Sequence, residues 1–141
     1  MRVLCVEDNS TLCKMIDLML APTGVNVDFA RTGDEAVEAY QVNEYDAVVM
    51  DMEMPVEAGL KTAREIRQME EGFHPGYTPI LFLSGGSGKA RLEHVLEQVL
   101  EAGGDGHLAK PFTSEALIGA IDSVLKTTHH DGLGQMLRAL R

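Results

Sequence analysis

Short apolar runs alternate along the chain with longer stretches in which apolar residues recur every three or four positions. The short runs predict buried strands, and the longer stretches predict amphipathic helices. The predicted strands cover residues 2–6, 25–30, 46–51, 79–84 and 106–109. Each is followed by one apolar stripe of helical spacing, the first of which consists of Leu12, Met15, Ile16 and Met19. Five strand–helix pairs in succession predict an α/β fold with a parallel sheet covered by helices on both faces.

Residues that begin and end helices lie between these runs. Thr32 and Glu35 have the spacing of a capping box, in which each of the two side chains accepts a hydrogen bond from the backbone N–H of the other residue. Other hydroxyl residues placed to cap a following helix are Ser10, Ser87 and Thr113. Gly103 and Gly104 predict the end of the fourth helix. Residues 69–78, rich in Gly, Pro and Glu, are interpreted as a long loop before the fourth strand.

The length and net charge of the chain limit the number of domains and the kinds of partner to expect. A chain of 141 residues that is 45% hydrophobic can bury one core, so we expect one domain over residues 1–126. The pattern changes after that point, and residues 127–141 are interpreted as a short C-terminal tail with apolar residues at helical spacing. The 22 acidic residues outnumber the 12 Lys and Arg, and a formal charge of −10 repels phosphate backbones and anionic lipid. Direct binding to nucleic acid is therefore not expected.

Targeting signals and cysteines add two expectations. No apolar run approaches the ~20 residues that cross a bilayer, and acidic residues follow the N-terminus too soon for a signal peptide. We expect a soluble, cytoplasmic protein without membrane insertion. Cys5 and Cys13 lie in apolar surroundings and lack the spacing of a metal site, which favours reduced thiols over a disulfide or zinc.

Polar residues stand where the predicted strands end. Ligands of an open parallel α/β sheet bind beyond the carboxyl ends of its strands. Glu7 and Asp8 follow the first strand, and Asp51 ends the third after a run of four apolar residues. Ser84 ends the fourth strand, and Lys110 follows the fifth. These five side chains are the candidate functional residues.

The three acids among these candidates predict a metal site. Carboxylates drawn together at one edge repel one another unless a cation or a shared proton offsets their charge. Mg²⁺ prefers oxygen ligands and takes one or two carboxylates together with water. Asp8, Asp51 and the backbone carbonyl of Glu53 fit that demand, and Glu7 would hold a bound water.

Lys110 and Ser84 would bind an anion between themselves and the metal. This arrangement suits phosphoryl transfer, which mainly requires positioning and neutralisation of charge on the transferring oxygens. In this interpretation Asp51 is the nucleophile that accepts the phosphoryl group. Lys110 pairs with the incoming group, and Ser84 reports its presence by hydrogen bonding.

Over roughly residues 1–125 the chain resembles the receiver domain of two-component response regulators, chemotaxis receivers among them. The residues that carry the resemblance are Glu7-Asp8, Asp51-Met52-Glu53-Met54-Pro55 with Gly59, Ser84, and Lys110-Pro111-Phe112. The resemblance implies a three-layer flavodoxin-like (βα)5 fold with strand order 2-1-3-4-5. It also implies phosphorylation by a histidine kinase or a histidine phosphotransfer protein, and a cis Lys110–Pro111 bond that directs Lys110 inward.

The resemblance further implies a switch. In the family, the Ser84 hydroxyl moves toward the phosphoryl group and an aromatic residue on the fifth strand turns inward behind it. His107 stands at that position, where Tyr or Phe is more usual. It is either an ordinary, partly buried strand residue or the mark of a weaker or pH-sensitive switch. The glycines in residues 85–88 are a second departure from the family and predict a mobile loop.

Several roles are open to such a domain. We expect a stand-alone response regulator that relays phosphoryl groups or changes its affinity for a target, reading out through the fifth strand and its flanking helices, as a monomer or a phosphorylation-dependent dimer. It would catalyse only its own phosphorylation and dephosphorylation. The first alternative is a receiver excised from a larger hybrid histidine kinase. The second is a Mg²⁺-dependent aspartyl-phosphate phosphatase, although Glu53 stands where such enzymes carry a second Asp.

Overall fold

The computed structural model describes residues 1–54, 58–72, 76–85 and 89–129. Strands and helices alternate through them, with one short 3-10 turn, η1, after the first helix. In chain order the elements are β1 (Arg2–Val6), α1 (Ser10–Leu20), η1 (Ala21–Thr23), β2 (Asn26–Ala30), α2 (Gly33–Val42), β3 (Ala47–Asp51), α3 (Ala58–Gly72), β4 (Ile80–Ser84), α4 (Lys89–Ala102), β5 (Gly106–Ala109) and α5 (Ser114–His129).

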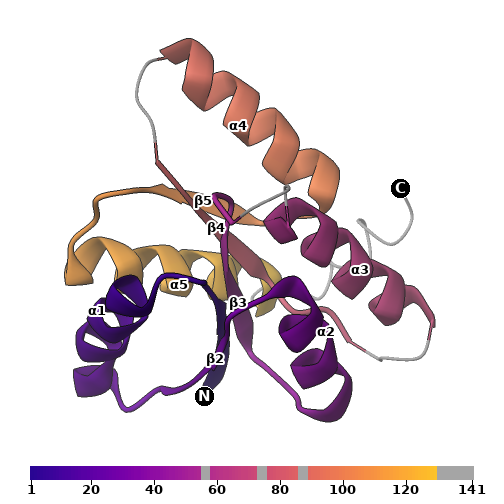
Figure 1. Cartoon of the computed structure of the whole chain (residues 1–141), viewed down its shortest axis with the longest axis horizontal. Helices are drawn as coiled ribbons and strands as arrows, with labels where there is room; N and C mark the ends of the chain where they lie inside the picture. The colour runs from indigo at the N-terminus through magenta and orange to yellow at the C-terminus, as the bar shows by residue number, and fades with distance from the viewer. Residues whose placement is uncertain (55–57, 73–75, 86–88, 130–141) are drawn as a thin grey trace.

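The five strands form one parallel sheet in the order β2-β1-β3-β4-β5, which confirms the predicted topology. Helices α1 and α5 lie together on one face of this sheet, and α2 and α3 lie on the other (Figure 1). Helix α4 packs against α3 and β5, and its buried side chains belong to the same core as those of α3. The molecule therefore has the three layers of the flavodoxin-like fold.

Alternation along the three central strands divides the core in two. Even-numbered strand residues such as Val48 and Met50 pack with α2, α3 and α4. Odd-numbered residues such as Val49 pack with α1 and α5. Because successive strand side chains point to opposite faces, every residue of β3 and β4 is buried on one side or the other. The polar residues that end these strands, Asp51 and Ser84, are therefore buried.

Helix α1 begins with a cap that the sequence analysis assigned wrongly. Ser10 is the first helical residue, and the cap is Asn9, whose Oδ1 accepts a hydrogen bond from the N–H of Leu12 at 3.0 Å. Asparagine and serine cap helices about equally well, so the extended backbone of Asn9 decides the boundary. The cap predicted at Ser87 lies outside the described residues.

The capping box predicted at α2 forms in part, because the bond returned by Glu35 goes to Arg31 and not to the cap residue Thr32. Thr32 Oγ1 accepts from the N–H of Glu35 at 3.1 Å, and Glu35 reaches back to the N–H of Arg31 at 2.7 Å. Thr113 caps α5 as predicted, through the N–H of Ala116 at 3.1 Å. Gly103, with φ of 89°, follows the end of α4 in the left-handed conformation that favours glycine.

The loop predicted over residues 69–78 is shorter than expected, because α3 continues to Gly72. Met69 is buried in the core, so its packing favours another helical turn despite the polar residues around it. Helix α5 runs to His129 and therefore continues three residues past the expected end of the domain. The rest of the predicted tail lies outside the described residues. Within the described part of the chain, no helix is long and apolar enough to span a membrane.

A buried ion-pair network joins α3 to the start of β4 and of β5. The Arg67 guanidinium bonds Glu70 at 2.5 Å and Asp105 at 2.9 Å, and all three side chains are largely buried. Arg67 also donates to the carbonyl of Gly103 at 2.9 Å and to that of Thr78 at 2.9 Å. These partners come from three segments of the chain. The network therefore fixes the C-terminal end of α3, which lies at the edge of the sheet away from the candidate site.

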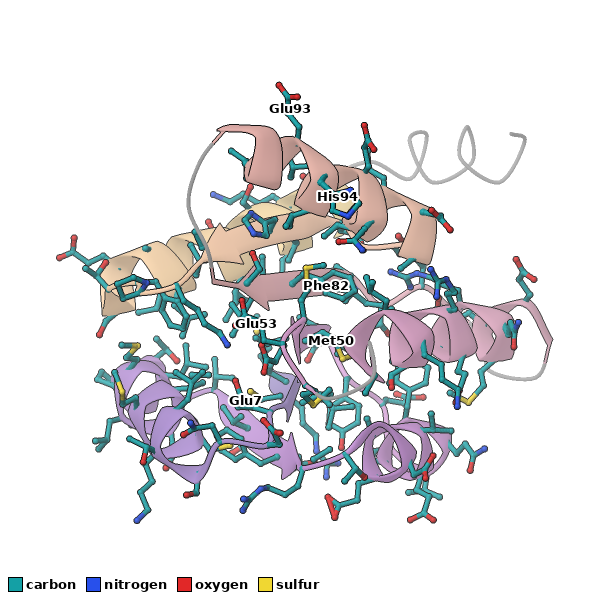
Figure 2. The ribbon with its side chains drawn as sticks, turned by 45° about the horizontal axis from the view of Figure 1, so that its top comes forward. Glu7, Met50, Glu53, Phe82, Glu93 and His94 are labelled. Carbon is teal, nitrogen blue, oxygen red and sulfur yellow. The ribbon has the colours of Figure 1, made fainter. Side chains whose placement is uncertain are left out.

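Helix α4 is covered more thinly. Between residues 92 and 102 its buried side chains are Val95, Val99 and Ala102. Three leucines spaced four residues apart are exposed on the same helix, namely Leu92, Leu96 and Leu100. The labelled Glu93 points away from the body of the protein (Figure 2). The helix that follows β4 is thus held by one narrow apolar stripe.

Candidate functional site

Sheet register brings the two buried acids of the site together. Val6 of β1 pairs with Met50 of β3, so the next residues, Glu7 and Asp51, lie side by side beyond the ladder. Both continue the odd-numbered rows on the face of α1 and α5. Glu7 is 1% exposed and Asp51 is 2% exposed. Their juxtaposition follows from parallel pairing alone.

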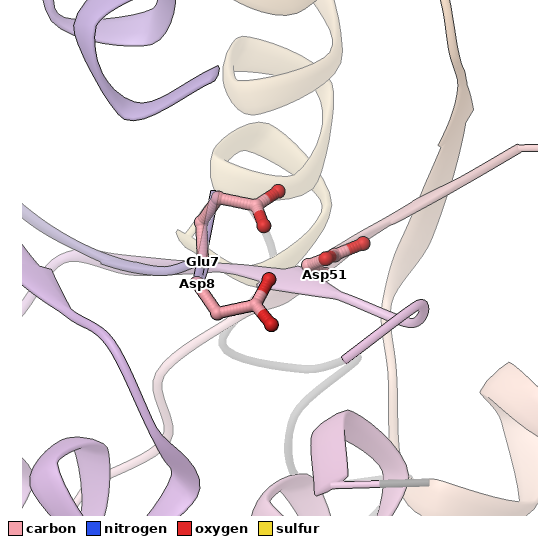
Figure 3. Close-up of side chains that lie close together, drawn as sticks. All are labelled: Glu7, Asp8 and Asp51. Carbon is pink, nitrogen blue, oxygen red and sulfur yellow. The ribbon is translucent and has the colours of Figure 1, made fainter. Parts of the chain in front are cut away.

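Asp8 completes a cluster of three carboxyl groups. Glu7, Asp8 and Asp51 each place one carboxylate oxygen within 4.8 Å of the others, and the Asp8 side chain is exposed while the other two are buried. In Figure 3 the side chains at the end of β1 and at the end of β3 lie close together. The predicted convergence of these acids at the carboxyl ends of the strands is therefore observed.

Lys110 is the cation of this cluster. Its Nζ lies 2.8 Å from Asp51 Oδ1 and 3.7 Å from Glu7 Oε1. Its backbone N–H donates to the carbonyl of Ser84 at 2.7 Å, and the Lys110–Pro111 bond is cis, as the resemblance implied. Burial alone would lower the pKa of Lys110, but the hydrogen bond and the charge of Asp51 raise it. The lysine stays protonated beside the acids.

Glu7 is only partly satisfied by the protein. Burial, together with the adjacent Asp51, raises the pKa of Glu7 to about 7. Its Oε2 accepts from the N–H of Asn9 at 3.2 Å, whereas Oε1 has no hydrogen-bond partner among the described residues. An orphaned carboxylate oxygen beside two more acids is a donor set that suits a hard divalent cation. The residues present therefore fit a metal such as Mg²⁺.

Ser84 and His107 form a pair at the ends of β4 and β5. Ser84 is buried, and its Oγ is hydrogen-bonded to His107 Nε2. His107 lies opposite Phe82 in the sheet and is half-buried, and this burial lowers its pKa. The side chain at the position of the family aromatic thus contacts the Ser84 hydroxyl directly.

The side chain of Glu53 has a position that the sequence analysis missed. Glu53 was expected to contribute its backbone carbonyl, but its carboxylate accepts a hydrogen bond from the N–H of Gly85. Its own N–H donates to Asp51 Oδ1 at 3.0 Å. The one signal in the sequence was the glycine after Ser84, because a side chain at Gly85 would crowd this carboxylate.

Comparisons with known proteins agree with this geometry. The family described as response regulator receiver domain matches residues 3–122. The cell cycle transcriptional regulator CtrA of Caulobacter vibrioides is 31% identical over 126 residues, which are 89% of this chain and 51% of that protein. The transcriptional regulatory protein DltR of Streptococcus agalactiae is 33% identical over 123 residues, 86% of this chain and 50% of that protein. The chain spans about half the length of these relatives.

Solved structures show the same likeness. The chemotaxis protein CheY4 of Vibrio cholerae is 28% identical, with a TM-score of 0.75 over 87% of this chain and 97% of that one. A putative response regulator from Chloroflexus aurantiacus is 29% identical, with a TM-score of 0.75 over 88% of this chain and 96% of that one. The family match covers most of the chain, and the strand order is that of these receivers. The chain belongs to the response regulator receiver domains of two-component signalling.

Proposed function

We propose that Asp51 accepts a phosphoryl group from the phosphohistidine of a histidine kinase or histidine phosphotransfer protein. The observation that carries this proposal is the position of Asp51. Its carboxylate is buried at the end of β3, 2.8 Å from the Lys110 ammonium and next to two further acids. A phosphoryl acceptor in a receiver domain needs a cation beside it, and Lys110 lies nearer to Asp51 than to Glu7.

The transfer is a substitution at phosphorus. A carboxylate oxygen of Asp51 attacks, the P–N bond to the donor histidine breaks, and the imidazole leaves with the electron pair of that bond. The product is an acyl phosphate, which water later hydrolyses to inorganic phosphate and the free carboxylate. Lys110 orients the incoming group and offsets its charge, because its Nζ already contacts Asp51.

Receiver domains bind Mg²⁺ at an acidic pocket, and the chain has residues that fit it. Asp8 and Asp51 would hold the ion with the backbone carbonyl of Glu53, and Glu7 would hold it through a water molecule. The Oε1 of Glu7, which accepts no hydrogen bond from any described residue, supports this assignment. When bound, Mg²⁺ supplies positive charge against the transferring phosphoryl oxygens.

Ser84 and His107 would convert phosphorylation into a conformational signal. In the unphosphorylated protein the Ser84 hydroxyl is hydrogen-bonded to His107. A phosphoryl oxygen on Asp51 would draw this hydroxyl away, which leaves His107 free to change its rotamer at the edge of the sheet. The signal would be read on β5 and its flanking helices.

At the level of the whole protein we propose a single-domain response regulator acting in the cytoplasm. It either passes the phosphoryl group to a histidine phosphotransfer protein or changes its affinity for a target, as a monomer or a phosphorylation-dependent dimer. The match of the family over residues 3–122 supports a receiver as the working part of the chain.

The test uses a small phosphodonor and Mg²⁺. Wild-type protein incubated with acetyl phosphate should gain one phosphoryl group by mass spectrometry, and Asp51→Asn should gain none. If Asp51→Asn incorporates phosphate like the wild type, the proposed acceptor is wrong. Multiple turnover of p-nitrophenyl phosphate would favour a phosphatase instead. A phosphotransfer profile against the histidine kinases of the source organism would then identify the donor.

A further inference from the structure

We infer that the Glu53 carboxylate occupies, in the unphosphorylated protein, the backbone donor that an oxygen of the Asp51 phosphoryl group takes after phosphorylation. Glu53 is thus a built-in competitor of phosphorylation. This inference rests on the proposed function of Asp51. It concerns the regulation of the site, since a competitor of this kind sets how readily the phosphorylated state forms.

The position of the Glu53 side chain is set from both ends. Its N–H donates to Asp51 Oδ1 at 3.0 Å, which fixes the main chain directly after the acceptor strand. Its carboxylate accepts from the N–H of Gly85, which lies 32 residues further along the chain. In Figure 2 the labelled Glu53 lies between the labelled Glu7 and Phe82. Glu53 therefore connects the end of β3, which it follows in the chain, to the residue after β4.

The Gly85 N–H is positioned to serve Asp51. The carbonyl of Leu83 accepts from the N–H of Met52 at 2.9 Å, and the carbonyl of Ser84 accepts from the N–H of Lys110 at 2.7 Å. These bonds hold the end of β4 between Met52, which follows Asp51, and Lys110, which binds the Asp51 carboxylate. The next backbone donor after Ser84 is the Gly85 N–H. It stands beside the Ser84 hydroxyl, where an anion held by Lys110 would need a further donor.

Gly85 leaves room for the carboxylate. A Cβ at this position would lie 2.7 Å from Glu53 Oε1 and 3.3 Å from its Cδ. No left-handed φ angle calls for glycine at this position, and a larger residue would displace the end of the Glu53 side chain and not the backbone. The close approach of an acidic side chain to this N–H is thus a property of the residue pair.

Electrostatics makes the two occupants mutually exclusive. The charge of Glu53 contributes to the raised pKa of Lys110, so its carboxylate lies within electrostatic reach of the site. A phosphoryl group on Asp51 would carry about two negative charges in place of the single charge of the carboxylate, and like charges at such distances repel. The N–H of Gly85 cannot serve both anions. Because the Glu53 residue is exposed overall, its side chain can turn out into water when the phosphoryl group arrives.

The test measures binding of beryllofluoride, a phosphoryl mimic, in the presence of saturating Mg²⁺. Glu53→Ala should bind it about tenfold more tightly than the wild type, since one charge-assisted hydrogen bond no longer has to be broken. Glu53→Gln, which keeps an acceptor oxygen without the charge, should lie between the two. Glu93→Ala is the matched control, because it removes a negative charge that points away from the site. Its affinity should equal that of the wild type.

A second measurement tests the contact itself. The amide resonance of Gly85 in a ¹⁵N-labelled resting protein should move upfield in Glu53→Ala, because a hydrogen bond to a carboxylate is lost. Unchanged beryllofluoride affinity in Glu53→Ala, with Asp51-dependent binding in the wild type, would overturn the inference and leave the proposed function standing. Absence of any Asp51-dependent binding in the wild type would overturn the proposed function and the inference together.

Discussion

Asp51 ends a fully buried strand, yet one of its oxygens already accepts two hydrogen bonds. Lys110 Nζ and the N–H of Glu53 both donate to Oδ1, at 2.8 and 3.0 Å. Glu7, by contrast, has a buried oxygen that accepts no hydrogen bond within the described part of the chain. The protein thus stabilises the proposed acceptor directly and leaves the neighbouring acid to a cation or a proton. The two adjacent carboxylates therefore differ in how far the protein itself satisfies them.

Asp8 is the residue to change when the metal site is tested. Asp8→Asn should weaken Mg²⁺ binding by at least about tenfold, because loss of even an outer-sphere partner costs a metal site that much. Lys110→Ala should leave the Mg²⁺ affinity largely intact while it impairs phosphorylation and signalling. Isothermal calorimetry suits the measurement, since the chain has no tryptophan to report binding. Equal Mg²⁺ affinities for Asp8→Asn and wild type would contradict the assignment.

His107 makes the stability of the resting state depend on pH. Its pKa in the folded protein is lowered from 6.5 by burial, so the unfolded chain binds the proton first as the pH falls. The stability that His107 contributes is therefore present above pH 6.5 and is lost as the pH falls below that value. The raised pKa of Glu7 acts in the opposite direction, because the folded state then binds the proton first.

The measurement is a difference between two proteins. Urea unfolding of wild type and His107→Gln at several pH values between 5 and 8 cancels the contribution of Glu7. The advantage of the wild type over the variant should shrink as the pH falls. A constant difference across this range would show that His107 does not titrate differently in the folded and unfolded states.

At the scale of elements, the strand ends could be predicted and several side-chain positions could not. Parallel pairing brings carboxyl ends to one edge, so Glu7 and Asp51 could be placed together from strand positions alone. The Glu53 carboxylate bonds a backbone N–H 32 residues away, and its direction depends on the path of the chain after β3. The end of α3 depends likewise on tertiary contacts, because Arg67 and Met69 bind partners distant in sequence.

Two helical glycines differ in whether the surrounding structure has room for a side chain. Gly59→Ala would place a Cβ 2.3 Å from the carbonyl oxygen of Asp51, and a backbone atom cannot move aside cheaply. The variant should be less stable and should bind Mg²⁺ more weakly. Gly119→Ala, whose added Cβ meets no atom of the described residues within 4 Å, should raise the free energy of unfolding by about 0.5–1 kcal/mol. Thermal unfolding of both variants checks the pair, and stabilisation by Gly59→Ala would refute the predicted clash.

The Arg67 network should dominate the ion-pair energetics of the fold. Arg67→Ala leaves Glu70 and Asp105 buried without their cation, which costs about 3–5 kcal/mol. Lys126→Ala breaks a pair with Asp122 whose side chains are more than half exposed, and should change stability by less than about 1 kcal/mol. Chemical denaturation measures both. Similar losses in the two variants would mean that burial does not strengthen the network.

In the whole molecule, the sheet separates two cores that are connected through the site. Asp51 belongs to the row of side chains that faces α1 and α5, whereas Glu53 bonds the start of the segment that leads from β4 into α4. The site therefore has neighbours on both faces of the sheet. The face of α2 and α3 is reinforced by the Arg67 network, and α4 beside it has no comparable buried ion pair among the described residues.

The thin cover of α4 has a dynamic consequence. Local opening costs the least free energy where few apolar contacts must break, so backbone amides of α4 should exchange with solvent faster than those of α3. Hydrogen–deuterium exchange followed by mass spectrometry can compare the two helices, and slower exchange in α4 would contradict this expectation. When a helix already opens at low cost, a modest free-energy change at the phosphorylation site can shift the balance between its conformations. Phosphorylation would then change the conformation of the surface around the α4 leucines more easily than that of any better-packed helix.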